Sequence, residues 1–305
     1  MPMGSSQIAS ISSFIDETSA IIIPWSSDKD KSNVMKGDDR KFYYLKSDIG
    51  LATYTDDFGL QWTQLYDDYR KDRYKHLDQF LRLGYKPDFL DGKNCLDVGC
   101  GLGRLSEIAL GRANYVFGVD MSAAIPEAAR VIRSDKFIPV QASADQMPLK
   151  SGSFDFVYCW GVLHHTQNPS KTLQELWRVL KPGGTLAIWV YPRSDWYLKR
   201  SLLTKYFSSL DEHEMLDFAT FLTSLSHTTQ LTSNSYLQML ASDLCYTIKN
   251  TKEYTRHILY DGLGPNYHYL LDSEWFKMNS SRLNNVESID SVDHPYTVAR
   301  IKKSL

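Results

Sequence analysis

The strongest constraint on the fold is a regular alternation of apolar runs and amphipathic stretches between residues 93 and 191. The apolar runs are short and rich in Val, Ile and Phe, and such strands are typical of a parallel sheet buried on both faces. Right-handed crossover connections then place helices on each side of the sheet. The predicted strands are residues 94–99, 115–120, 138–143, 154–159 and 185–191, and the predicted helices are residues 104–112, 123–132 and 169–180.

The pattern changes after Tyr191, where residues 195–262 show helical spacing with no strand between the helices. A helix at 272–280 and strands at 284–290 and 296–303 then return to the earlier pattern. The predicted fold is a Rossmann-like α/β fold, with a seven-stranded, mostly parallel sheet, helices on both faces and a helical cap insertion. The expected divisions are a partly flexible N-terminal extension (1–40), an N-terminal helical lid (41–92), the ligand-binding core (93–194), the cap (195–262) and the C-terminal part of the core (263–305).

Composition narrows the class of protein. The chain has 305 residues and a formal net charge of −2, which gives no electrostatic reason to expect a nucleic-acid partner. Its four cysteines form no CxxC pair, so neither a disulfide framework nor a metal site is expected. The sequence shows no run long enough to span a membrane and no basic secretory leader, which predicts a cytoplasmic protein.

A glycine loop, CLDVGCGLGRL at residues 95–105, joins the first predicted core strand to the next helix. Its G-x-G-x-G spacing lacks the last glycine of the dinucleotide fingerprint, and no lysine-serine or lysine-threonine pair of a P-loop follows it. Asp97 would repel a pyrophosphate but attract an ammonium group. The loop therefore favours a ligand that carries an amino acid, such as S-adenosylmethionine (SAM), over NAD(P) or ATP.

Two further acidic residues follow at the ends of predicted strands. Asp120 stands about twenty residues after the loop, where an acid accepts hydrogen bonds from ribose hydroxyls. The alternative for Asp120 is a helix N-cap. Asp145 follows the next strand and is suited to accept a hydrogen bond from an adenine amine, or else is an ordinary loop carboxylate.

Four segments together closely resemble the class I SAM-dependent methyltransferases, in the group that acts on small molecules and includes quinone and sterol methyltransferases. They are LDVGCGLGRL, VFGVDMS, ASADQMPLKSGSFDFVYCWGVLHH and ELWRVLKPGGTLAIWVY, within residues 93–192. The resemblance implies SAM as cofactor and S-adenosylhomocysteine as product. It implies that the methionine part is bound by Asp97, Gly99, Cys100, Gly101 and Gly103, the ribose and adenine by Asp120 and Met121, the adenine by Ala144, Asp145 and Gln146, and the floor of the site by Trp160 and Gly161.

Candidates for the reacting side lie near the end of the fourth strand and in two distant segments. His164 is the first candidate for a general base, and the alternative is a structural role capping that strand. Tyr267 and His268, in a loop flanked by Gly264 and Pro265, are the other catalytic candidates. The acceptor-binding candidates are Phe58, Gln61, Trp62, Tyr66, His165 and Tyr191, of which the first four belong either to a lid or to a helix packed on the sheet edge.

The predicted function is methyl transfer from SAM to a small organic acceptor. Oxygen is favoured as the acceptor atom because histidines and tyrosines outnumber any carboxylate cluster suited to an amine, and nitrogen and carbon remain open. The alternatives are a SAM-binding cyclase or isomerase on the same fold and an NAD(P)-dependent oxidoreductase. No metal, nucleic acid or membrane span is expected, and the apolar cap either roofs the acceptor site or forms a homodimer contact.

Overall fold

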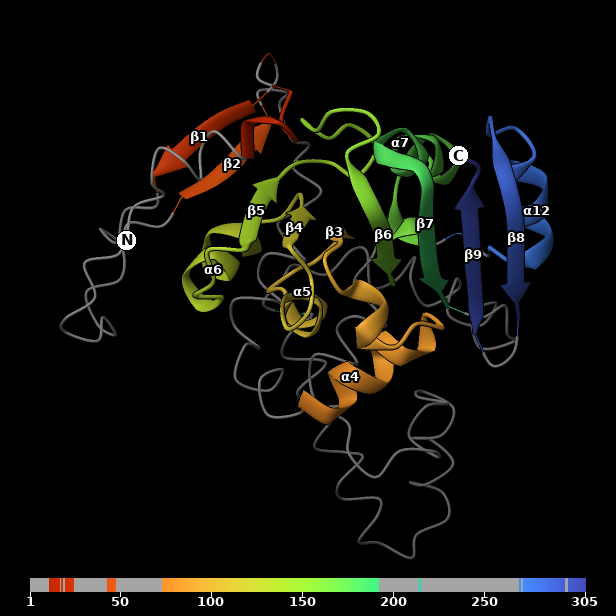
Figure 1. The fold of residues 1–305 in the computed structure, drawn as a ribbon, viewed down its shortest axis with the longest axis horizontal. Coiled ribbons are helices and arrows are strands. Elements are labelled where there is room, and N and C mark those ends of the chain that lie inside the picture. Colours follow the sequence, from red (N-terminus) through yellow and green to blue (C-terminus); the bar gives the residue numbers. More distant parts are fainter. Residues whose placement is uncertain are drawn as a thin grey trace, which may run out of the picture.

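The computed structural model describes residues 11–16, 18, 20–24, 43–47, 73–191, 214, 269, 271–293 and 296–305. They form a nine-stranded sheet with helices on both faces (Figure 1). The strands are β1 (Ala20–Pro24), β2 (Tyr43–Ser47), β3 (Asn94–Val98), β4 (Tyr115–Asp120), β5 (Phe137–Gln141), β6 (Phe154–Trp160), β7 (Leu180–Val190), β8 (Val286–Val292) and β9 (Thr297–Lys303). The helices are α4 (Arg73–Arg82), α5 (Arg104–Leu110), α6 (Ala124–Val131), α7 (Pro169–Val179) and α12 (Ser273–Ser280), with 3₁₀ turns η3 (Pro87–Leu90) and η4 (Leu163–His165).

The strand order is β1-β2-β5-β4-β3-β6-β7-β9-β8, and β2 to β7 run parallel while β9 is antiparallel to both β7 and β8. The chain moves outward from β3 through β4 to β5, and then returns to β6 on the other side of β3. This reversal makes the carboxyl ends of β3 and β6 the switch point of the sheet, where ligands bind in open α/β folds.

The predicted seven-stranded, mostly parallel sheet with helices is confirmed by the strands from β5 to β8. The largest shift in a boundary is in β7, which begins at Leu180 rather than at Thr185. Residues 181–184, between the predicted helix and the predicted strand, form an irregular part of β7, because the register with β6 shifts there and Gly183 has a φ of 74°.

Alternation along the strands divides the core between the two faces of the sheet. On β6, Val157 and Cys159 belong to the cluster that includes side chains of α7 and α12. Phe156, Tyr158 and Trp160 belong to the opposite cluster, with side chains of α4 and α5. Because side chains two apart share a face of a strand, Trp160 projects on the same face as Tyr158 at the carboxyl edge.

Two strands and a packed segment near the N-terminus were not predicted. Strands β1 and β2 pair antiparallel, and β2 adds to the edge of β5 (Figure 1). Before them, Ile11 and Ile15 are buried in the core, and the ring of Phe14 lies 5.1 Å from that of Phe117. Part of the predicted N-terminal extension is therefore a constituent of the core.

Several predictions concern residues outside the described part of the chain. The lid candidates at 58–66 and almost all of the cap at 195–262 belong to this group. Within the described residues, no helix is both long enough and apolar enough to cross a bilayer.

Candidate active site

The glycine loop connects β3 to α5 at the switch point. Its backbone is held from the neighbouring strand β4, because the amides of Gly99 and Cys100 donate to the carbonyl of Val119 at 2.7 and 3.0 Å. Gly99 has a φ of 76°, and a Cβ there would stand 2.0 Å from Cγ2 of Val162. Glycine is thus required at this position both by the backbone conformation and by the approach of the segment after β6.

Asp97 is the buried acid of the site. Its carboxylate accepts a 2.7 Å hydrogen bond from the hydroxyl of Ser106, on α5, and its residue is 2% exposed. Burial raises the pKa of Asp97 from 3.8 to about 7, against the opposing effects of the Ser106 hydrogen bond and the nearby charge of Arg104. A carboxyl in this setting gains most from a ligand that brings its own positive charge.

Asp120 ends β4 and orders the loop. Its two carboxylate oxygens accept the amides of Gly101 and Ser122, each at 2.9 Å. The alternative of a helix N-cap does not hold, because Ala123 is the N-cap of α6 and Asp120 instead bridges the glycine loop and the segment after β4. Met121 lies within that segment, and its carbonyl accepts from the side-chain amide of Gln141 at 3.5 Å.

The loop after β5 carries Ala144, Asp145 and Gln146. The side chain of Asp145 accepts a hydrogen bond from the hydroxyl of Ser143. It also forms an ion pair with Lys171, on α7, at an N–O distance of 3.1 Å. Partial burial opposes ionisation of Asp145, but these two partners outweigh it and lower the pKa. The carboxylate is therefore anionic near neutral pH, with each oxygen already engaged by one protein donor.

Trp160, the last residue of β6, stacks on Trp189 with ring centroids 4.3 Å apart and planes 7° apart. Gly161 follows with a φ of 70°, and its amide donates to the carbonyl of Trp189 at 2.9 Å. Trp189 was not among the sequence candidates. The signal that identifies it is its position near the end of β7, two residues before Tyr191, because side chains two apart in an extended chain point to the same side.

His164 and His165 form a buried pair in η4, directly after β6. Their rings are 4.0 Å apart, and the ring of Tyr191 lies 4.6 Å from that of His164 and 5.8 Å from that of His165. The amide of Tyr269 donates to the carbonyl of His164 at 2.9 Å, so the chain after the cap returns to this cluster. The structure thus brings three of the predicted acceptor-side residues together.

The other acceptor-side candidates, Phe58, Gln61, Trp62, Tyr66, Tyr267 and His268, lie outside the described residues. In the part of the chain that the structure describes, no three His, Cys, Asp or Glu side chains are grouped as metal ligands would be. Cys100 is buried in the glycine loop, and burial raises the pKa of its thiol well above the ordinary value.

Fold and site together define a doubly wound α/β domain. Near its switch point lie a glycine loop, acids at or after the ends of three strands, and an aromatic-histidine cluster. Residues 96–188 match the family model described as a methyltransferase domain. This segment is therefore similar to SAM-dependent methyltransferases, as the sequence resemblance predicted. SAM is therefore the cofactor that the family implies.

Curated relatives match the same segment. A ubiquinone biosynthesis O-methyltransferase of Pseudomonas paraeruginosa is 39% identical over 99 residues, covering 31% of this chain and 43% of the relative. Another, of Idiomarina loihiensis, is 36% identical over 116 residues, covering 35% and 46%. The chain thus spans less than half the length of these relatives. A SAM-dependent methyltransferase structure of Methanococcus maripaludis aligns with a TM-score of 0.48 at 14% identity, over 84% of this chain and 97% of that one.

Proposed function

We propose that this protein transfers a methyl group from SAM to a hydroxyl group of a small organic acceptor. The observation that carries the proposal is the cluster of His164, His165 and Tyr191 after β6 and β7. Strand β6 is the immediate neighbour of β3, which leads into the glycine loop. A cluster that can take a proton is thus placed beside the site that the family uses for its cofactor.

The residues at the switch point fit this cofactor. Asp97 offers a buried carboxylate to the ammonium group. Asp120 keeps lone pairs for ribose hydroxyls, since a carboxylate has about four acceptor sites and the two amides use two of them. When bound, SAM supplies an electrophilic methyl group on a sulfonium centre.

His164 is the proposed general base. Its imidazole is buried beside Tyr191, and a ring nitrogen with a free lone pair would accept the proton of the acceptor hydroxyl as the oxygen attacks. His165 and Tyr191 pack against it and limit its rotation. Alignment of the acceptor oxygen with the methyl group supplies a further share of the rate.

The surroundings indicate a planar acceptor. Trp160 and Trp189 are stacked, and Tyr191 and Tyr296 lie with ring centroids 5.3 and 5.7 Å from Trp189. Aromatic surfaces bind flat, largely apolar molecules through area and ring packing. The names of the relatives, which describe O-methyltransferases, support oxygen as the acceptor atom.

The test is the release of S-adenosylhomocysteine from SAM by the purified protein. A panel of ring-hydroxylated aromatic compounds is compared with the matching aromatic amines, and the products are identified by mass spectrometry. The proposal expects methylation of hydroxyl compounds only. Methylation of the amines alone would contradict it. Binding of SAM with no release for any acceptor would favour a cyclase or isomerase, and binding of NADH instead of SAM would reject the cofactor.

A further inference from the structure

The loop between β5 and β6 (residues 142–153) carries the residues proposed to meet adenine, but it has almost no regular structure of its own. Two residues in its central part, Met147 and Leu149, are 5% and 1% exposed. Backbone groups in such a buried loop need partners, because an unpaired buried amide or carbonyl is costly. Those partners come from two elements, the N-terminal segment and helix α7.

The N-terminal segment supplies one set of partners. The amide of Asp16 donates to the carbonyl of Pro148 at 3.1 Å, and the amide of Lys150 donates to the carbonyl of Phe14 at 2.8 Å. These bonds form an antiparallel bridge between Ile15 and Leu149. They involve main-chain atoms, so they hold the loop whatever the side chains are.

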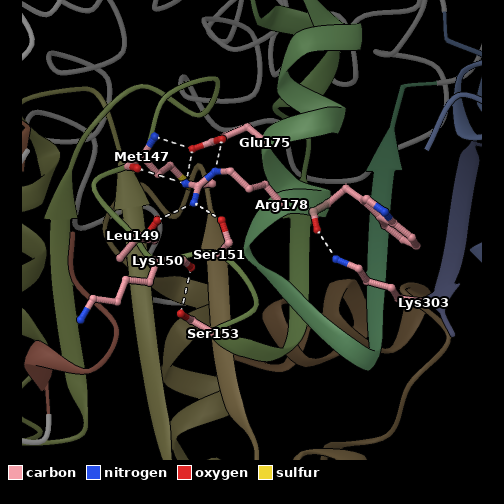
Figure 2. Close-up of polar contacts among 9 residues, drawn as sticks. Met147, Leu149, Lys150, Ser151, Ser153, Glu175, Arg178 and Lys303 are labelled. Carbon is pink, nitrogen blue, oxygen red and sulfur yellow. Dashed lines mark hydrogen bonds and ion pairs between the residues drawn. The ribbon is translucent and has the colours of Figure 1, made fainter. Parts of the chain in front are cut away.

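Helix α7 supplies the other set through Glu175 and Arg178, which we term the α7 clasp (Figure 2). The guanidinium of Arg178 donates to the carbonyls of Leu149 and Met147 at 2.7 and 3.3 Å and to the hydroxyl of Ser151 at 3.1 Å. The Glu175 carboxylate accepts the amide of Met147 at 2.8 Å. Two hydrogen bonds of 2.7 Å join Glu175 to Arg178.

The clasp differs from an ordinary surface ion pair. Glu175 is mostly buried, with 13% of its side chain exposed. The hydrogen bonds to Glu175 raise the pKa of Arg178, so its charge is fixed over all relevant pH values. Exposed pairs contribute little, whereas this one satisfies three backbone groups of a buried loop at once.

The clasp contacts the loop directly after residues 144–146, which are proposed to bind adenine. Its first contact, Met147, directly follows Gln146, and the amide of Gln146 itself bonds back to the carbonyl of Ser143. Asp145 is tied to the same helix by Lys171, which lies one turn before Glu175. One face of α7 therefore fixes the loop on the C-terminal side of residues 144–146 and also reaches the acid within them.

We infer that Glu175 and Arg178 are positioning residues for recognition of the adenine base, acting through the loop rather than by touching the ligand. This inference rests on the proposed function and on the assignment of residues 144–146 to adenine. It predicts that the clasp determines how well the site distinguishes the 6-amino group of adenine from a 6-oxo group. Removing the clasp should therefore weaken this distinction in a protein that still folds.

The experiment compares binding of S-adenosylhomocysteine and S-inosylhomocysteine, in which the amine is replaced by an oxo group, by isothermal titration calorimetry. Wild-type protein should prefer the adenine compound by about tenfold or more, because a carboxylate meets an amine donor in one case and an oxygen in the other. Arg178→Met should reduce the preference to about twofold or less. Arg178→Lys keeps the positive charge but loses the forked arrangement of N–H donors. Its preference for the adenine compound should lie between those of wild type and Arg178→Met.

The matched control is Gln174→Ala, an exposed substitution on the same helix that should leave the preference unchanged. The preference is the ratio of the dissociation constants of the two compounds for the same variant. A partly unfolded fraction lowers the binding of both compounds equally, so it does not change this ratio. An unchanged preference in Arg178→Met, with wild type selective, would overturn the inference and leave the proposed function intact. Wild-type binding of both compounds with equal affinity would overturn the assignment of the loop to adenine. Binding of neither would reject the proposed function as well.

Discussion

Replacing Asp97 with asparagine should stabilise the unliganded protein and at the same time remove its affinity for SAM. The carboxyl is buried at the end of β3 with Ser106 as its hydrogen-bond donor, and burial raises its pKa to about 7. Below about pH 4 the group is protonated in both the folded and the unfolded chain, so it has no effect on stability. Between about pH 4 and 7 the unfolded chain loses the proton first, and the folded state is progressively disfavoured.

The size of this effect follows from the pKa. A rise from 3.8 to about 7 corresponds to roughly 4 kcal/mol at 1.36 kcal/mol for each pKa unit, which is an upper bound for the gain from Asp97→Asn above pH 7. Binding of the SAM ammonium group reverses the balance, because it needs the ionised carboxylate. For a single group with a pKa near 7, the SAM dissociation constant should be about fifteenfold larger at pH 5.5 than at pH 7.

Two measurements test this reasoning. Urea denaturation of wild type and Asp97→Asn at pH 5 and pH 7.5 should show a stability gain that is larger at the higher pH. Calorimetric titration with SAM between pH 5.5 and 7 should show this pH dependence in wild type and no binding to Asp97→Asn. A variant less stable than wild type at pH 7.5, or a wild-type affinity for SAM that is independent of pH, would refute the argument.

Three further predictions concern other parts of the molecule. Gly103→Ala should weaken SAM binding at least tenfold, as measured by calorimetry. The reason is that φ is 82° at this position and a Cβ would stand 2.2 Å from Cδ1 of Ile132. Wild-type affinity of the variant would contradict this prediction. His164→Gln should lower kcat by about 10²-fold or more with little change in SAM affinity, and a reduced affinity with unchanged kcat would instead indicate the structural role. Ile15→Ala should reduce the free energy of unfolding in urea by about 2–4 kcal/mol, since the side chain is 6% exposed in the main core; no change would mean that the N-terminal segment contributes nothing to stability.

The residues after β6 show which parts of the site sequence spacing can predict. The motif that ends in two histidines placed His164 and His165 at a strand end, and the structure adds that they contact each other and Tyr191. Trp189 was not predicted, although its position two residues before Tyr191 indicates that both side chains point to the same side of the chain. Ser106 was missed for a different reason: an unremarkable helix serine becomes part of the site only because α5 lies against Asp97.

The sequence by itself determined the features encoded within short windows, namely the seven core strands from their apolar runs and the helices between them from their spacing. The glycine loop and its acid predicted SAM, the cofactor that the methyltransferase domain implies. These signals are local, since periodicity and turn chemistry depend on neighbours along the chain. The tertiary structure alone decided the addition of β1 and β2 to the sheet edge, the burial of Ile15 and the clasp of Arg178 on its loop. Each of these depends on which distant segments meet, and on backbone groups that need partners only once the fold has buried them.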